Sequence, residues 1–188
     1  MPDVAAVLSD VRRALTELGL RWYVFGAQAA IHYGSPRSTA DVDVTVEADP
    51  ERFHELLQAF SRAEIRARVP SLDREFVRRT RVLPLVHSSG MEVDVVLAGP
   101  GLEERFLDNA HLADVAGTIV PMASATDVVV MKVLAGRPKD LEDVAGILRA
   151  HPPTLDLTQA RELLEGLSEL LDRADLVRCL EDLVSRRR

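Results

Sequence analysis

The 188-residue chain has little of several residue types, and each shortage excludes a class of protein. Its single cysteine, Cys179, excludes an internal disulfide and any cysteine-rich metal site. Aromatic residues make up 4% of the chain, too few for a strong stacking platform for single-stranded nucleic acid. The histidines form no pair at a spacing typical of metal ligands. Lys and Arg number 23 against 30 Asp and Glu, and the net charge of −7 disfavours bulk binding of nucleic acid.

Long apolar runs are also missing. No run approaches the length of a membrane span, so we expect no membrane partner. The segment Met1–Leu20 is amphipathic and carries acids, unlike a signal peptide, which predicts a cytoplasmic protein. The remaining composition, 47% hydrophobic and 28% charged, is that of a globular protein. The length suits one domain, or one domain with a small helical appendage.

The order of the predicted elements indicates a mixed α+β (α/β) fold with a small sheet and a helical C-terminal part. The run His151-Pro-Pro153 is the best boundary, dividing the chain into a domain at 1–150 and a helical appendage at 151–188. Two appendage helices are expected to meet near Gly166-Leu-Ser168. The arginine-rich stretch 63–80 gives no clear element. Helical spacing predicts helices over 4–18, 27–33, 51–60, 102–109, 128–134 and 139–149. β-type patterns predict strands over 21–25 and 41–47, a hairpin of strands over 81–86 and 91–97 that His87–Gly90 joins, and a second hairpin over 113–122.

Two carboxylates share one face of the predicted strand over 41–47. Asp41 and Asp43 are two positions apart, so their side chains point the same way, while Val42 and Val44 face the core. Adjacent carboxylates repel each other unless a cation lies between them, and Mg²⁺ prefers oxygen ligands. The alternative is a strand with one solvated face, which is the commoner meaning of a lone Asp-x-Asp pattern.

A third acid comes from the predicted strand over 91–97. Glu92 and Asp94 share a face there, and we favour Asp94 because valines flank it on both sides. Three carboxylates from two neighbouring strands are able to hold two Mg²⁺ ions, an arrangement that supports phosphoryl or nucleotidyl transfer. The sequence therefore predicts Asp41, Asp43 and Asp94 as a combined metal and catalytic site.

Two segments upstream of these acids suit a phosphate. Gly26-Ala27 lies where a strand gives way to a helix, and free N–H groups at a helix start attract anions. Arg37 lies in the following loop, where its guanidinium suits a phosphate oxygen, and Ser38 offers a hydroxyl donor. The alternatives are an ordinary tight turn at Gly26, an internal salt bridge from Arg37 to Asp41, and loop bonding by Ser38.

One lysine falls within an apolar helical run. Lys132 either extends to the edge of the apolar surface or reaches into a site, where a compact cation suits a triphosphate. Asp143 lies in the next predicted helix and is placed to orient a basic group. Its alternative is an exposed pair with Lys139, worth about 0.2–0.5 kcal/mol.

Taken together, the segment from Gly26 to Asp43, GAQAAIHYGSPRSTADVD, resembles the first motif of the nucleotidyltransferase superfamily with the DNA-polymerase-beta-like fold. It looks most like the bacterial abortive-infection type, which includes toxins of toxin–antitoxin pairs. The segment from Lys132 to Asp143, KVLAGRPKDLED, is similar to a later motif of these proteins. The resemblance runs from about Trp22 to Leu148. The family pattern after the first strand is Gly-Gly or Gly-Ser, whereas this chain has Gly26-Ala27.

The resemblance implies a twisted mixed β-sheet flanked by helices and transfer of a nucleoside monophosphate from an NTP, with release of pyrophosphate. It implies Asp41 and Asp43 as metal ligands, Asp94 as third ligand and base, and Lys132 as a contact of the triphosphate. The acceptor is an RNA such as tRNA, a protein or a small molecule, and a toxin of this kind has an antitoxin partner. The alternative is a non-catalytic module that binds a nucleotide or a partner.

The arginines of the stretch 62–81 have two interpretations. They form either a solvated charged surface, which is slightly favoured, or a track for an RNA backbone on an otherwise acidic protein.

Overall fold

The computed structural model describes residues 3–186, which form two compact units. Unit 1 comprises 3–28 and 39–123, and unit 2 comprises Ala29–Ser38 and 124–186. The units therefore divide the chain after Ala123, whereas the sequence placed a boundary near His151. The independent domain predicted over 1–150 and the appendage over 151–188 stay predictions.

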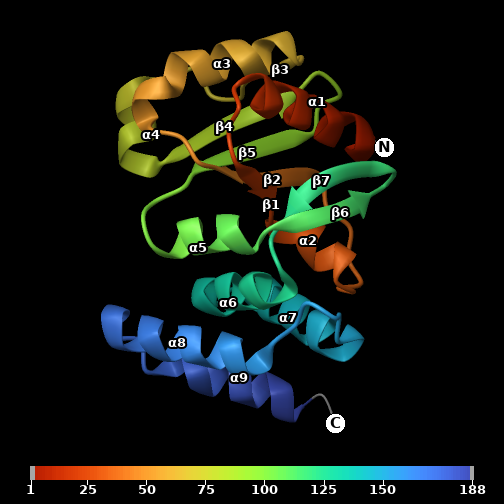
Figure 1. Cartoon of the computed structure of the whole chain (residues 1–188), viewed down its shortest axis with the longest axis vertical. Helices are drawn as coiled ribbons and strands as arrows, with labels where there is room; N and C mark the ends of the chain where they lie inside the picture. Colours follow the sequence, from red (N-terminus) through yellow and green to blue (C-terminus); the bar gives the residue numbers. More distant parts are fainter. Residues whose placement is uncertain (1–2, 187–188) are drawn as a thin grey trace. The chain divides into compact units, whose positions relative to one another are not determined.

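Unit 1 is built on a mixed β-sheet, which has seven strands within the described residues (Figure 1). The strand order is β3-β4-β5-β2-β1-β7-β6. β2 runs parallel to β5, β1 runs parallel to β7, and the remaining neighbours are antiparallel. The strands are β1 (Trp22–Val24), β2 (Asp41–Val46), β3 (Ile65–Ala67), β4 (Val82–His87), β5 (Glu92–Leu97), β6 (His111–Val115) and β7 (Thr118–Met122).

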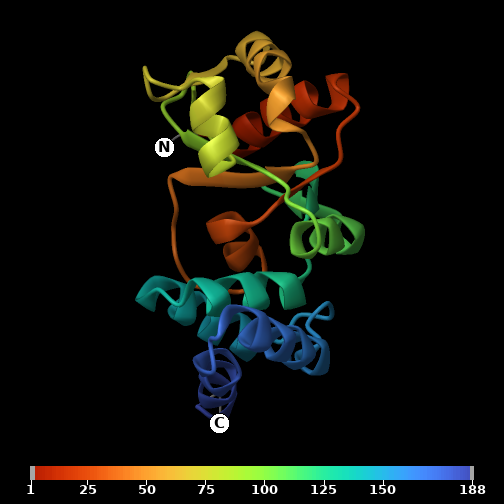
Figure 2. The same cartoon turned by 90° about the vertical axis from the view of Figure 1, so that its left-hand side faces the viewer.

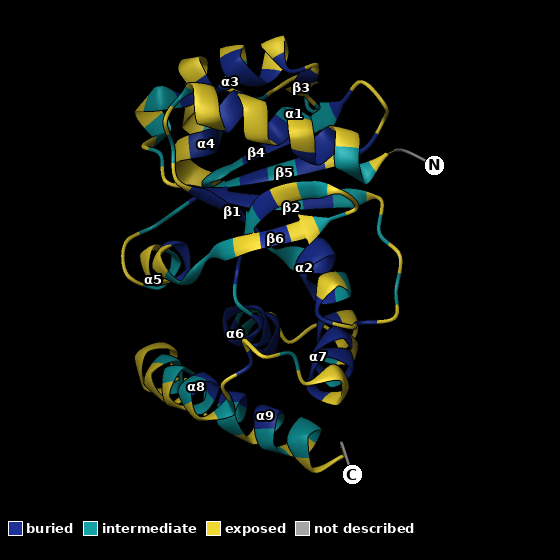
Figure 3. Ribbon diagram, turned by 45° about the vertical axis from the view of Figure 1, so that its right-hand side comes forward, coloured by how far each residue is buried: buried dark blue, intermediate teal, exposed yellow. Residues whose placement is uncertain are grey.

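Helices α1 and α3 cover one face of this sheet and contact each other (Figures 1 and 2). The apolar positions of α1 repeat at helical spacing, and Leu8, Val11 and Leu15 are fully buried, while the opposite side of the helix is exposed (Figure 3). The helices of unit 1 are α1 (Val4–Glu17), the 3-10 helix η1 (Pro50–Arg52), α3 (Phe53–Arg62), α4 (Arg74–Thr80) and α5 (Leu102–Asn109). Helix α2 (Gly26–His32) contributes to both units.

Local sequence signals explain the start of several elements. The Asp49 side chain accepts a hydrogen bond from the Glu51 N–H at 2.7 Å, and Pro50 occupies the first helical position of η1. In β2, Val42 and Val44 are fully buried, and Asp41 and Asp43 lie on the other face. The sequence predicted this alternation, and it orients the carboxylates of the candidate site.

Unit 2 is helical. It contains α6 (Ala125–Ala135), α7 (Pro138–Ala150), α8 (Leu157–Leu171) and α9 (Asp175–Ser185). α6 packs against the other three helices, and its buried residues run all round the helix, as expected for a central element. The Ser124 hydroxyl accepts a hydrogen bond from the Asp127 N–H at 3.1 Å and so caps the start of α6.

Two parts of the helical and strand assignment differ from the sequence-based prediction. The stretch 63–80, for which no element was predicted, forms the three-residue strand β3 and helix α4. The prediction that the last two helices meet near Gly166-Leu-Ser168 is wrong, because α8 continues through Gly166 to Leu171. The helix ends at Asp172, which has a left-handed backbone conformation. Within the described part of the chain, no helix has the length and apolar character that a membrane crossing needs.

Candidate functional site

Two parallel strands of unit 1 carry the predicted catalytic carboxylates on one face of the sheet. β2 pairs with β5 in a register that sets Asp43 opposite Asp94 and Asp41 opposite Glu92. Registered residues of paired strands point to the same face of the sheet. The structure therefore brings Asp43 and Asp94 together as lateral neighbours, while Asp41 has Glu92 as its lateral neighbour.

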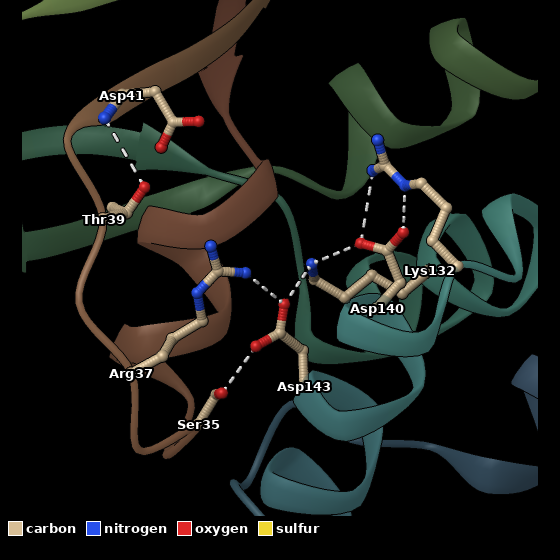
Figure 4. Close-up of polar contacts among 8 residues, drawn as sticks. Ser35, Arg37, Thr39, Asp41, Lys132, Asp140 and Asp143 are labelled. Atoms are coloured by element: carbon tan, nitrogen blue, oxygen red, sulfur yellow. Dashed lines mark hydrogen bonds and ion pairs between the residues drawn. The ribbon is translucent and has the colours of Figure 1, made fainter.

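Asp41 has an unsatisfied oxygen. Its Oδ1 atom is buried and has no hydrogen-bond partner among the described residues. Its backbone is held locally: the N–H donates to Thr39 Oγ1 at 3.5 Å (Figure 4), and the carbonyl accepts from Gln28 Nε2 at 3.1 Å. A buried carboxylate oxygen without a donor is costly unless a cation satisfies it. This oxygen is the feature of the structure that fits a divalent cation.

Asp94 is held by an arginine that the sequence did not single out for the site. Arg68 Nη2 lies 2.8 Å from Asp94 Oδ1, and the same guanidinium pairs with Glu92. Burial raises the pKa of Asp94 above its ordinary value; the charge of Arg68 lowers it, and the charge of Asp41 raises it.

The donor set fits Mg²⁺ in part. Among residues 3–186, no three or more His, Cys, Asp or Glu side chains are grouped as metal ligands. Asp41 and Asp43 share a face and supply carboxylate oxygens, which are the ligands that Mg²⁺ prefers. Asp94 has Arg68 as its cation, so it joins a metal only by exchanging that partner.

The strand–helix turn of the first motif lies directly against Asp43. Gly26 has a φ of +62°, in the left-handed region that favours glycine. A Cβ atom on residue 26 would lie 1.9 Å from Asp43 Oδ2. The Phe25 N–H, one residue earlier, donates to the Asp43 carbonyl at 3.0 Å. The Asp43 carboxylate thus occupies the space that any side chain at residue 26 would fill. The next residue in the chain, Ala27, is buried.

Lys132 belongs to a buried ion cluster in unit 2 (Figure 4). Its Nζ lies 2.6 Å from Asp143 Oδ2 and 3.2 Å from Asp140 Oδ1, and its side chain is only 7% exposed. Asp143, with a side chain 2% exposed, also accepts from Ser35 Oγ at 2.6 Å and from Arg37 Nη1 at 2.9 Å. Contact of Lys132 with a triphosphate stays a prediction, and in this structure its ammonium is bound by carboxylates.

The cluster keeps its carboxylates ionised. Burial on its own raises the pKa of Asp143, but the hydrogen bonds from Lys132 and Ser35 and the charge of Lys132 outweigh it, so the pKa is lowered. In Asp140, burial is likewise outweighed, here by the hydrogen bond from Arg137 and the charge of Lys132, and its pKa is also lowered. Buried charges are tolerated here because each one is paired.

The structure decides some of the alternatives that the sequence left open for Arg37, Asp143 and Ser38. Arg37 does form an internal salt bridge, and its partner is Asp143. The exposed pair between Lys139 and Asp143 is wrong, because Asp143 is buried and its lysine partner is Lys132. Ser38 is exposed at the end of the loop, and its contact with phosphate stays a prediction.

The arginine-rich stretch is largely neutralised within unit 1. Arg74 and Arg78 both pair with Glu51, and Arg62 pairs with Glu17. Arg81 donates to the carbonyl groups of Leu97 and Ala98. With Arg68 held by Glu92 and Asp94, most of these side chains have local partners, which favours the predicted charged surface over a continuous RNA track.

Sequence reasoning missed several residues of the site. Arg68 was grouped with the other arginines of the stretch 62–81, because no clear element was predicted around it. Ser35 has no distinguishing local pattern, and Asp140 lies within the later motif but was given no role. Gly146 lies against Ser35, and a glycine inside the predicted helix over 139–149 is the one local signal that could have indicated a close approach there.

The comparisons with known proteins agree with the fold. A family model described as "Nucleotidyltransferase of unknown function (DUF6036)" matches residues 5–165. No curated protein matches the chain.

Several solved structures share the architecture at low sequence identity. The antibiotic-resistance factor ANT(2'')-Ia has a TM-score of 0.59 at 15% identity, over 89% of this chain and 94% of that chain. An antigenic nucleotidyltransferase-like protein from Paracoccidioides brasiliensis has a TM-score of 0.56 at 20% identity, over 94% and 91%. The lincomycin-bound lincosamide antibiotic adenylyltransferase LnuA has a TM-score of 0.53 at 10% identity, over 77% and 96%. These likenesses confirm the predicted mixed sheet flanked by helices.

Proposed function

We propose that this chain, which belongs to the DUF6036 family of nucleotidyltransferases, is an Mg²⁺-dependent enzyme. It transfers a nucleoside monophosphate from an NTP to the hydroxyl group of a small molecule. One observation carries the assignment of the site. Asp43 lies beside Asp94 on the same sheet face as Asp41, whose buried Oδ1 has no partner within the described residues. This set of carboxylates is suited to hold divalent cations, which would satisfy the buried Oδ1 of Asp41.

In the proposed reaction, Asp41 and Asp43 hold Mg²⁺ and Asp94 is the third carboxylate. Bound Mg²⁺, as one ion or two, supplies Lewis-acid stabilisation of the phosphate charge. The acceptor oxygen forms a bond to the α-phosphorus of the NTP, the bond from that phosphorus to the bridging oxygen breaks, and pyrophosphate leaves. Asp94 takes the proton of the acceptor hydroxyl.

The remaining predicted residues bind the nucleotide. The backbone N–H groups of Gly26 and Ala27 suit a phosphate, and the missing hydroxyl at position 27 leaves this contact to the backbone alone. Arg37 and Ser38 are proposed to bind phosphate from the loop. Lys132 and Asp143 support that loop from a buried position.

The proposal of a small-molecule acceptor is supported by charge. The net charge of −7 and the paired arginines disfavour an RNA backbone and suit a neutral or cationic hydroxyl compound. ANT(2'')-Ia is described as an antibiotic-resistance factor and LnuA as a lincosamide adenylyltransferase, and both share this fold. The tRNA acceptor, the toxin role and the antitoxin partner stay predictions from the resemblance.

Labelled NTPs test the proposal and its acceptor class together. Each NTP, labelled on the α-phosphate, is incubated with the protein, Mg²⁺ and a cell extract separated into small molecules, RNA and protein. We expect label in the small-molecule fraction and release of pyrophosphate, both lost on chelation of the metal. Label in RNA or protein would show that the acceptor is that macromolecule and not a small molecule. Binding of NTP without pyrophosphate release would favour the non-catalytic module.

A further inference from the structure

The loop Gly34–Ser38, here called the Arg37 loop, lies closely against one face of helix α7. A Cβ atom on Gly34 would lie 2.5 Å from Ala150 Cβ, and one on Gly146 would lie 2.8 Å from Ser35 Cα. Asp143, Gly146 and Ala150 are spaced at i, i+3 and i+7, so they share one face of α7. The close approach needs the absence of a side chain at residue 146 as well as at residue 34.

Asp143 fixes the same loop by hydrogen bonds. Its Oδ1 accepts from Ser35 Oγ at 2.6 Å and its Oδ2 from Arg37 Nη1 at 2.9 Å (Figure 4). Lys132 Nζ, 2.6 Å from Oδ2, supplies the charge that keeps this buried carboxylate ionised. Both oxygens of Asp143 are therefore used for positioning, and contact with a nucleotide is not needed to explain its place.

Arg37 is only partly used by this contact. Its side chain is 27% exposed, whereas Asp143 is almost fully buried. A guanidinium has five N–H donors, and within the described residues the Arg37 side chain donates through Nη1 alone. These unused donors suit an anion.

We propose that α7 is the positioning element of the Arg37 loop. Asp143 and Gly146 clamp the loop onto the helix so that the unused donors of Arg37 are preorganised for an NTP phosphate. Asp143 and Lys132 are then positioning residues, which act on the nucleotide through Arg37. The nucleotide part of this inference rests on the proposed function, and the clamp itself rests on the contacts within unit 2.

A pair of glycine variants isolates the clamp. Gly146→Ala adds a methyl group against Ser35, while Gly166→Ala adds the same group in α8, where nothing lies within 4 Å of it. Both glycines are inside helices, so any general effect of alanine on helix formation is shared. Asp143→Asn is the second variant, since it keeps the side-chain shape and removes the charge.

Trypsin, which cleaves after Arg37, reports on the clamp without any nucleotide. For Gly146→Ala and Asp143→Asn, we expect cleavage after Arg37 to accelerate about tenfold and KM for the NTP to rise about tenfold, with kcat within about twofold of wild type. Gly166→Ala should match wild type in both assays. A general loss of folding would instead accelerate cleavage at every arginine.

The outcomes separate this inference from the proposed function. Faster cleavage after Arg37 in a protein that neither binds nor turns over any NTP supports the clamp and rejects the function. Equal cleavage and equal KM for Gly146→Ala and Gly166→Ala would overturn the inference, whether or not the wild type is active. A fall in kcat at unchanged KM for Asp143→Asn would overturn the positioning role.

Discussion

Gly26 has no side chain, and the Asp43 carboxylate uses the space that a side chain would fill. Residues 26 and 43 are the two ends of the first motif and lie in different elements, so the sequence pattern shows a turn glycine and a strand acid and not their contact. The turn and the carboxylate are therefore one structural unit, and a change at residue 26 acts on the candidate site through Asp43.

The first prediction uses two glycines with the same backbone conformation. Gly19 and Gly26 both have a φ of +62°, but a Cβ atom on Gly19 meets nothing within 4 Å. Both alanine variants carry the left-handed strain of about 1–2 kcal/mol. Only Gly26→Ala displaces Asp43, and a displacement on the order of 1 Å at a reacting group costs about a hundredfold in rate.

The measurement is nucleotidyl transfer by both variants, with urea unfolding as the control for stability. We expect both variants to lose unfolding free energy, Gly26→Ala the more because its methyl group also displaces Asp43, and a loss of transfer confined to Gly26→Ala. Equal activity of the two variants would show that the contact between Gly26 and Asp43 has no part in the reaction.

A second prediction concerns Arg68 and the pH dependence of Asp94. Burial raises the pKa of Asp94 and the charge of Arg68 opposes it, so Arg68→Met should raise this pKa further. A carboxyl with a raised pKa destabilises the folded state once it is ionised. The variant should therefore lose more unfolding free energy than wild type as the pH rises from the ordinary value of 3.8 through the folded pKa.

Carbon-13 NMR titration of the Asp94 carboxyl checks this shift, with Arg78→Met as the control because Arg78 pairs with Glu51 at the surface. An unchanged pKa of Asp94 in Arg68→Met would mean that the charge of Arg68 does not affect this carboxyl group in solution.

At the scale of elements, helix α7 and the end of α6 are joined by buried charge. The pKa values of Asp140 and Asp143 are lowered, so their ionised forms stabilise the folded state. This contribution to the unfolding free energy is complete when the pH is above 3.8, the ordinary pKa of an aspartate, and is lost as the pH falls through the lowered pKa values of the folded state.

The third prediction follows from this sign. Asp143→Asn should lower the unfolding free energy at neutral pH by about 3 kcal/mol, because Lys132 keeps only one carboxylate partner in a buried site. Below the ordinary pKa the difference between variant and wild type should shrink. Urea unfolding across acidic to neutral pH measures it, and a difference that is constant with pH would contradict the lowered pKa of Asp143.

Elements with a strong local pattern were predictable from the sequence, and those without one were not. The alternation of β2 and the hairpin turn at His87–Gly90 follow from residue order, and both are present. Strand β3 has three residues and two of them are exposed, so no alternation is detectable. Helix α4 ends at Arg81 in a left-handed conformation that glycine usually adopts. Gly166 has open space around it, so α8 passes through it despite its low helix propensity.

At the scale of the whole molecule, sequence reasoning found the carboxylates and the loop residues but not their partners. Asp41, Asp43 and Asp94 were predictable because strand alternation fixes the face of each side chain. The hydrogen-bond and ion-pair partners of the site residues were not predictable. Arg68, just after β3, pairs with Asp94 of β5, and Asp143 accepts hydrogen bonds from Ser35 and Arg37, which lie about a hundred residues earlier in the sequence. Such pairings depend on tertiary contacts that no local pattern encodes.

Charge is also distributed over the whole molecule. The arginine-rich stretch seemed from composition to offer a basic patch within an acidic chain, and the structure pairs most of it with Glu17, Glu51 and Glu92. This region is therefore largely paired, and the net charge of −7 belongs to the chain as a whole. A chain with this net charge favours a neutral or cationic acceptor over a nucleic-acid backbone.

The most direct measurement is pyrophosphate release from each NTP by wild type, Asp41→Asn and Asp43→Asn, with Glu55→Gln, an exposed acid of α3, as the control. The two Asp variants keep the shape of the site and remove one carboxylate charge each. We predict release by wild type and Glu55→Gln and a loss of about a thousandfold or more in both Asp variants, as expected when a group that stabilises the transition state is removed. Release that continues at the wild-type rate in either Asp variant would contradict the assignment of the catalytic carboxylates.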